Sequence, residues 1–283
     1  MSKPILLITG ATGNQGGATI RALLAGPDRW HVRALVRDPS SPKARALALK
    51  GVEVVRGDLD DAASLRAALE GVHGVHSVQT PQEQGVEGEE RQGKLLASLA
   101  SEARVRHFVY SSAGGAERDS GVPHFDSKRA IELHVERLGL PATILRPAAF
   151  MDNFGSFQFR TIMLAMWKTY LPDGQTLQLV ATEDVGWFAA QAFDRPNEFI
   201  GRAVEIAGDA VTRPEAVRAL RRGGLRRILS LRIPRLLRGR LPEEYVRMFE
   251  WFNRAGFQAD VPALRREHPD MLTLGAWAAQ APA

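Results

Sequence analysis

Short apolar runs alternate with amphipathic stretches along the first half of the chain. Continuous apolar runs of four to eight residues are typical of strands buried on both faces of a sheet. Apolar positions spaced by three and four residues indicate helices between these strands, and glycines such as Gly51 and Gly71 mark helix ends. We predict strands over 5–9, 31–37, 52–58, 72–79, 107–112 and 142–147, and helices over 16–25, 42–51, 62–71, 89–103 and 127–139.

Strands that alternate with helices in this way predict parallel βαβ units. The expected fold class is therefore α/β, a Rossmann-type doubly wound parallel sheet with a smaller, mostly helical C-terminal lobe. We assign 1–150 to the Rossmann domain. Further strands over 176–182 and 203–208, on either side of a helix over 184–194, are expected to complete its sheet within 175–210. The smaller lobe is predicted to comprise 151–174 and 211–283.

The composition is that of an ordinary globular protein, because 45% of the 283 residues are hydrophobic and 24% are charged. The chain contains no cysteine, which excludes disulfides, thiolate nucleophiles and cysteine metal sites. The apolar run near the N-terminus is too short for a secretory signal, and no run approaches the ~18 apolar residues of a membrane span. We expect a cytoplasmic protein. The histidines lack metal-ligand spacing, so no metal is predicted.

Positive charge is concentrated in one segment, residues 213–240, which contains ten arginines and the single acid Glu215. Nucleic-acid contact and an anionic surface are possible functions of such a segment. A solvated basic face is the more common outcome for a charge run, and we do not expect nucleic-acid binding. Gly223-Gly224 and Pro234 interrupt any long helix there.

The most informative stretch is TGATGNQG, Thr9 to Gly16, in which Gly10, Gly13 and Gly16 are evenly spaced. It directly follows the first predicted strand and opens the first helix. Glycines at such a turn permit close backbone approach to a pyrophosphate, and the helix N-terminus offers free N–H groups. A plain strand–helix turn needs fewer glycines. This context predicts a dinucleotide phosphate cradle.

The end of the second strand indicates which dinucleotide is bound. An acid there suits the ribose 2′-hydroxyl of NAD, and an arginine suits the 2′-phosphate of NADP. Arg37 stands at the tip, with Ser40, Ser41 and Lys43 close behind, whereas Asp38 lies one step into the turn. We therefore predict NADP(H). The alternative is that Arg37 is an ordinary solvated surface arginine.

Polar residues also follow the third and fourth strands. Asp58 is placed to meet an adenine, although it could instead be the N-cap of the following helix, a role that Asp60 or Asp61 could also fill. Gln79 and Thr80 end the fourth strand. They are expected at the carboxyl edge of the sheet, where open α/β sheets bind ligands.

Several motifs, taken in order, resemble the NmrA-like family of atypical short-chain dehydrogenase/reductases. They are TGATGNQGG, VRDP, GDLDD, RQGKLLASLA, FVYSS, HFDSK and LRPAAFMDNF. The resemblance covers roughly 3–210 and returns at 242–277, and the Asn14-Gln15 pair is more specific than the glycines alone. Such proteins have an NADP(H)-binding Rossmann domain and a smaller helical lobe. Members include nitrogen-metabolism regulators, NADPH-binding redox sensors and quinone reductases.

The resemblance implies a set of cofactor-binding residues. The glycine loop and the turn after the second strand hold phosphates. Asp58 lies near the adenine, Gln79 and Thr80 near the inner ribose, and Lys128 at the nicotinamide ribose. The implied residues are Gly10, Ala11, Thr12, Gly13, Asn14, Gln15, Gly16, Arg37, Ser40, Ser41, Asp58, Leu59, Gln79, Thr80, Ser111, Lys128, Phe150 and Asn153.

One expected catalytic residue is missing. Reductases of the wider superfamily use a Tyr-x-x-x-Lys pair in which the tyrosine exchanges the proton that accompanies hydride transfer. In HFDSK the lysine is Lys128, but the tyrosine position holds His124. His124 could be a general acid, a binding residue, or a loop histidine with no role. Tyr110, Tyr170 and Tyr245 lie elsewhere in the predicted elements.

An intact cofactor cradle beside a vacant tyrosine position favours an NADP(H)-binding redox sensor or regulator over an enzyme. Such a protein would transmit cofactor occupancy to a regulatory protein partner. The alternative is an NADPH-dependent oxidoreductase acting on a quinone or similar carbonyl in a cleft between the lobes. A quinone accepts hydride without a dedicated protein acid, so the missing tyrosine does not exclude this activity.

Overall fold

The computed structural model describes residues 2–225 and 228–281. The chain forms two compact units. The first unit comprises 1–112, 127–145 and 185–204. The second comprises 113–126, 146–184 and 205–283.

The first unit is built on a seven-stranded sheet with the strand order β3-β2-β1-β4-β5-β6-β9. Neighbouring strands from β3 through β6 pair in parallel. The strands are β1 (Ile5–Ile8), β2 (His31–Val36), β3 (Glu53–Arg56), β4 (Val72–Ser77), β5 (His107–Ser111), β6 (Ala142–Pro147) and β9 (Ala203–Ile206). The order reverses direction beside β1, which is the switch point at which doubly wound sheets bind ligands.

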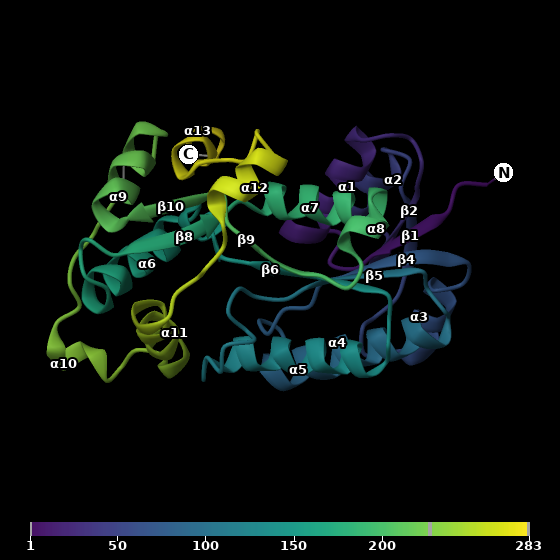
Figure 1. Cartoon of the computed structure of the whole chain (residues 1–283), viewed down its shortest axis with the longest axis horizontal. Coiled ribbons are helices and arrows are strands. Elements are labelled where there is room, and N and C mark those ends of the chain that lie inside the picture. The colour runs from purple at the N-terminus through teal and green to yellow at the C-terminus, as the bar shows by residue number, and fades with distance from the viewer. Residues whose placement is uncertain (1, 226–227, 282–283) are drawn as a thin grey trace. The chain divides into compact units, whose positions relative to one another are not determined.

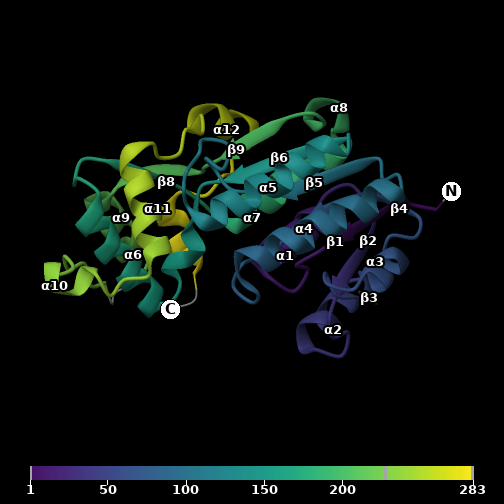
Figure 2. The same cartoon turned by 90° about the horizontal axis from the view of Figure 1, so that it is seen from below.

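Helices cover both faces of this sheet (Figure 1). Helices α4 and α5 run side by side on one face, where a Cβ on Gly93 would lie 2.5 Å from the Ile131 side chain (Figures 1 and 2). On the other face, Gly186 of α7 meets the backbone of Ala18 in α1. The helices are α1 (Asn14–Ala25), α2 (Pro42–Ala48), α3 (Ala62–Ala68), α4 (Gly85–Glu102), α5 (Pro123–Arg137), α7 (Thr182–Asp194) and α8 (Pro196–Phe199).

The apolar runs form strands because both faces of the sheet are covered. Leu7, Val75 and Phe108 have no exposed surface and pack with Leu96 and Ile131 from the helices α4 and α5. The predicted Rossmann-type α/β fold is thus confirmed. Two predicted helices begin earlier than expected, at Gly85 rather than 89 and at Pro123 rather than 127. Proline favours the first helical position, which explains the start of α5.

The second unit contains a separate three-stranded sheet with the order β10-β8-β7. The expectation that 175–210 would complete the Rossmann sheet therefore holds for β9 but is wrong for the strand predicted at 176–182. That strand pairs antiparallel with β10. The elements are β7 (Ala149–Phe150), β8 (Thr176–Val180), β10 (Asp209–Thr212), the 3-10 helix η1 (Met151–Phe154), α6 (Phe157–Tyr170), α9 (Arg213–Arg222), α10 (Arg235–Arg238), α11 (Glu243–Arg254), α12 (Val261–Glu267) and α13 (Leu274–Gln280).

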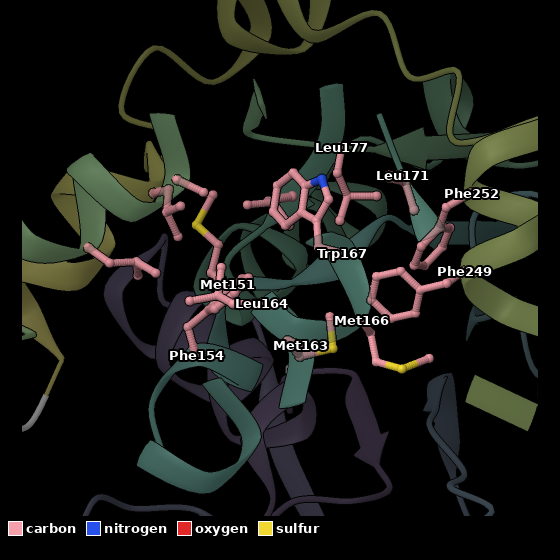
Figure 3. Close-up of a cluster of buried hydrophobic side chains, with 14 of the residues drawn as sticks. Met151, Phe154, Met163, Leu164, Met166, Trp167, Leu171, Leu177, Phe249 and Phe252 are labelled. Atoms are coloured by element: carbon pink, nitrogen blue, oxygen red, sulfur yellow. The ribbon is translucent and has the colours of Figure 1, made fainter. Parts of the chain in front are cut away.

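A dense aromatic and methionine core stabilises the second unit (Figure 3). Trp167 of α6 is fully buried in the middle of this cluster, among Phe154, Leu177 and Phe249. The helical C-terminal region therefore has its own hydrophobic core. Within 2–225 and 228–281, none of the helices is both long and apolar enough to cross a bilayer.

Buried His76 links stability to pH. The side chain has no exposed surface, and neither ring nitrogen has a hydrogen-bond partner among the described residues. Burial lowers the pKa of His76 from 6.5 to about 3. As the pH falls below ~6.5, the unfolded chain takes up this proton before the folded one, so stability is lost between roughly pH 6.5 and 3.

We expect His76→Leu to remove this loss. The free energy of unfolding of the wild type should fall more between pH 7.5 and 5.0 than that of the variant, by about 2 kcal/mol. Urea unfolding at the two pH values measures the difference. Burial also lowers the pKa of His107, to about 4. Because His107 is present in both proteins, its contribution to the loss of stability cancels in the comparison. Equal losses in both would contradict the prediction.

Candidate functional site

The end of β1 is joined to the end of β4 by one side chain. The Thr9 hydroxyl accepts a hydrogen bond from the Val78 N–H at 2.8 Å and lies 3.1 Å from the Val78 carbonyl. The chain then turns through Gly10, whose φ of +58° lies in the left-handed region that favours glycine. The Gly13 N–H closes the turn on the Gly10 carbonyl at 2.9 Å.

Gly16 has no room for a side chain. A Cβ at this position would lie 2.4 Å from the Gly10 carbonyl oxygen and 2.5 Å from that of Thr9. Helix α1 begins at Asn14, and no side chain caps its N-terminus. The N–H groups of the first helical turn therefore stand directly beside the end of β1, and this arrangement fits a pyrophosphate.

The parallel sheet gathers the other predicted residues. Arg37, Asp58 and Gln79 each follow a strand, and Ser111 ends β5. Since neighbouring strands are parallel, these carboxyl ends lie along one edge of the sheet. The Ser111 hydroxyl donates to the Gln15 side-chain oxygen at 2.5 Å, which ties β5 to the glycine loop.

Arg37 is exposed and holds a bidentate ion pair with Glu83, at 2.6 and 2.8 Å. This pair raises the pKa of Arg37. The Asp38 carboxylate accepts hydrogen bonds from the N–H and the hydroxyl of Ser40, at 2.8 and 2.6 Å. Ser41 is the N-cap of α2. The guanidinium is thus the cationic group at the tip of β2, and Asp38 is engaged within its own turn.

Asp58 is not the N-cap of the following helix. Asp61 fills that role and accepts from the Ala63 N–H, while Asp58 accepts from the Asp60 N–H at 3.0 Å. Of the neighbouring predicted residues, Leu59 packs against the core of the first unit. Gln79 is buried and Thr80 is exposed.

Lys128 has a partner that the sequence did not predict. Its ammonium nitrogen lies 2.8 Å from Oε1 of Glu89, a residue of α4 with no exposed surface. It also lies 3.5 Å from the Gln79 carbonyl oxygen. One signal was available in the sequence: Glu89 occupies the same helical face as the buried residues Gly93, Leu96 and Ala100. A charge on an apolar helix face demands a buried partner.

His124 lies in the first turn of helix α5 and not in a loop. Its Nδ1 lies 2.5 Å from Oε1 of Glu244, within the second unit. No tyrosine replaces the missing donor at the strand ends of the first unit. Tyr110 is fully buried, and burial raises its pKa well above 10. Tyr170 and Tyr245 pack around the core of the second unit.

Two predicted residues belong to the second unit, where Phe150 lies in β7 and Asn153 in η1. Between them, the Asp152 carboxyl accepts from the N–H and the hydroxyl of Thr182, at 3.2 and 2.9 Å. Burial raises the pKa of Asp152. These contacts fix the turn that carries Asn153 within its own unit.

The arginine-rich segment begins as helix α9, which a capping box between Thr212 and Glu215 initiates. Ala216 and Leu220 bury the inner face of α9 in the core of the second unit, and Arg218, Arg221 and Arg222 are exposed on its outer face. Arg213, at the start of the helix, is mostly covered and pairs with Asp173. Residues 226–227 lie outside the described residues. In the part of the chain that the structure describes, no cluster of three histidines or acids could hold a metal ion.

The comparisons with known proteins agree with this architecture. The model of the NmrA-like family matches residues 2–269, and the chain belongs to this family. The NmrA-like oxidoreductase malD of Malbranchea aurantiaca is 34% identical over 163 residues, a match that covers 54% of this chain and 48% of malD. The chain thus spans about half the length of that relative. The NAD(P)H azoreductase of Xenophilus azovorans is 30% identical over 75% of this chain and 69% of the azoreductase.

Two solved structures share the fold over almost the whole chain. The negative transcriptional regulator NmrA in complex with NADP superposes with a TM-score of 0.79 and 22% identity, covering 99% of this chain and 95% of NmrA. NmrA has also been solved with NAD. The NADPH-dependent quinone oxidoreductase QOR2 of Escherichia coli, complexed with NADPH, gives 0.77 and 22%, covering 98% of this chain and 99% of QOR2.

Adjacent glycines provide a test of the turn. A Cβ at Gly17 would meet its nearest atoms at 3.4 and 3.5 Å, an ordinary contact, whereas one at Gly16 would overlap two carbonyl oxygens. We expect Gly16→Ala to lower the free energy of unfolding by about 1–3 kcal/mol. Gly17→Ala should be neutral or stabilising by up to ~1 kcal/mol, because alanine is the better helix former. Urea unfolding measures both, and equal effects would contradict the structure.

Proposed function

We propose that this protein binds NADP(H) at the carboxyl edge of its parallel sheet. The observation that carries the proposal is the contact at Gly16, which brings the first turn of α1 against the end of β1. The N–H groups of Asn14, Gln15 and Gly16 are suited to the pyrophosphate. Asp58 would face the adenine, and Lys128 would hold the nicotinamide ribose.

The preference for NADP(H) over NAD(H) rests on Arg37. Its guanidinium is the group at the tip of β2 that can bind a 2′-phosphate bidentately. Asp38, the acid that could favour NAD, already accepts two hydrogen bonds from Ser40. Ser40 and Ser41 lie in the same turn, where their hydroxyls donate to Asp38.

We propose that the bound cofactor serves sensing, so that the protein is a redox-state sensor or regulator that reports its occupancy to a protein partner. His124 stands at the tyrosine position, and the charge of Lys128 is offset by buried Glu89. We infer that the first unit holds a dinucleotide, whereas its tyrosine, Tyr110, is fully buried and unsuited to exchange a proton. The absence of cysteine and the use of NADP(H) fit the cytoplasm, where we propose that the protein works.

A second candidate is an NADPH-dependent reductase. The azoreductase that is 30% identical over three quarters of this chain favours it. NADPH, when bound, supplies a hydride. A conjugated acceptor such as a quinone takes the accompanying proton from water, so the chain itself needs only to position the reactants. Lys128 is the residue of the first unit that could assist at such a site.

The role of Arg37 can be tested directly. We expect Arg37→Ala to weaken NADP⁺ binding by about 10- to 100-fold, the range for losing charge-assisted hydrogen bonds to a phosphate, while NAD⁺ binding stays unchanged. Isothermal titration with both ligands measures this difference. Arg66→Ala, which removes another exposed and ion-paired arginine of the first unit, is the control. Equal affinities for both ligands, unaltered in Arg37→Ala, would refute the NADP(H) preference.

Turnover separates the two candidates. A sensor should bind NADPH without oxidising it above the buffer rate when a panel of quinones and azo compounds is added, as followed by absorbance at the nicotinamide band. Steady oxidation that disappears in Lys128→Ala, but persists in Lys94→Ala, would rule out the sensor and establish the reductase. Lys94 is the matched control because it also lies in the first unit and pairs with a glutamate.

A further inference from the structure

One buried carboxylate in the first unit has a position that packing alone does not explain. Glu89 of α4 has no exposed surface, although acidic side chains are almost never fully buried unless paired. A charge in such a place is retained when it is paired and hydrogen-bonded on both oxygens. The partners of Glu89 therefore indicate what it does.

Both oxygens of Glu89 are engaged by consecutive residues of α5. Oε1 accepts from the Lys128 ammonium at 2.8 Å, and Oε2 accepts from the Ser127 hydroxyl at 2.6 Å. Two such charge-assisted bonds fix the carboxylate at one place between α4 and α5. Glu89 is thus a rigid anchor for the end of the Lys128 side chain.

The anchor places Lys128 at the edge of the sheet. Its ammonium lies 3.5 Å from the carbonyl oxygen of Gln79, which follows β4. An ammonium has three N–H donors. Among the residues that the structure describes, Glu89 and Gln79 account for two, which leaves the third for a ligand. The side chain of Lys128 is only 12% exposed, and its contacts with Glu89 and Gln79 fix where the ammonium lies.

We propose that Glu89 is a positioning residue that takes the place of the missing tyrosine as the partner of Lys128. It holds the ammonium so that the third N–H is presented to the hydroxyls of the nicotinamide ribose. Its negative charge also offsets that of the ammonium, so the pair favours holding a ribose over activating a proton donor. This inference rests on the proposed binding of NADP(H).

A positioning role predicts that the two halves of the cofactor respond differently. Lys128 would contact only the nicotinamide half, whereas Arg37 and Asp58 would serve the adenine half. Losing the anchor should therefore weaken NADP⁺ but leave 2′,5′-ADP, which lacks the nicotinamide half, unaffected. A residue that merely stabilised the fold would affect both ligands alike.

The test is isothermal titration of wild type and Glu89→Gln with NADP⁺ and with 2′,5′-ADP. Glutamine keeps the size of the side chain and a polar contact for Ser127, but removes the charge that holds Lys128. We expect NADP⁺ affinity to fall about tenfold or more, while 2′,5′-ADP affinity stays within about twofold. Glu132→Gln is the control, because Glu132 is also fully buried but pairs with Arg129.

Ser127→Ala is a second test variant that can be titrated if Glu89→Gln folds poorly. Ser127→Ala removes the hydrogen bond on Oε2 without adding or removing a charge. Ser127→Ala should lower the affinity for NADP⁺ relative to that for 2′,5′-ADP by about threefold. Thermal unfolding of each variant establishes that the titrated protein is folded.

The outcomes are distinct. A selective loss of NADP⁺ affinity in Glu89→Gln, absent in Glu132→Gln, supports the positioning role. Equal losses for both ligands, or unchanged NADP⁺ affinity, overturn it while leaving NADP(H) binding in place. Wild type that binds neither ligand refutes the proposed function itself, and the positioning role with it.

Discussion

The steric contact between the start of α1 and the end of β1 is the constraint on which the candidate site depends. A Cβ at residue 16 would lie 2.4 Å from the Gly10 carbonyl oxygen, so only glycine allows the helix to begin this close to the strand. The short separation brings the free N–H groups of the helix to the switch point of the sheet. The parallel pairing of the strands then adds Arg37, Asp58 and Gln79 along the same edge.

The chemistry open to the candidate site also depends on the charge balance around Lys128. In a Tyr-x-x-x-Lys reductase the lysine lowers the pKa of a tyrosine, which requires a net positive charge close to the phenol. Here the tyrosine position holds His124, and the ammonium faces a fully buried carboxylate at 2.8 Å. This charge balance is the basis for the proposal that the first unit holds a dinucleotide and does not deliver a proton. Both a sensor and a reductase of acceptors that take protons from water are consistent with this balance.

The sequence predicted the Rossmann sheet well, because strands that are buried on both faces contain continuous apolar runs such as Ile5–Ile8 in β1 and residues 108–110 in β5. The sequence did not predict which sheet a strand joins, because that depends on tertiary contacts. The strand Thr176–Val180 has a clear β pattern, but that pattern does not specify the sheet it joins, and it pairs with Asp209–Thr212. Two helices, α4 and α5, begin four residues before their predicted starts, at Gly85 and Pro123.

In the candidate site, too, the sequence predicted the local motifs but not the tertiary contacts. The glycine loop, Arg37 and Lys128 follow from local motifs. The loop and Arg37 directly follow β1 and β2, and Lys128 lies in the second turn of α5. The ion pairs did not follow, because Glu83 lies 46 residues from Arg37 and Glu89 lies 39 residues from Lys128. Only the fold brings such residues together. Glu89 could have been suspected from its place on the apolar face of α4, but the identity of its partner could not.

The most direct test of the account is a crystal structure of this protein with NADP⁺. We expect the pyrophosphate oxygens within hydrogen-bond distance of the backbone N–H groups of Asn14 and Gln15, with the 2′-phosphate on the Arg37 guanidinium. A dinucleotide bound away from the glycine turn, or a 2′-phosphate that makes no contact with Arg37, would contradict the account.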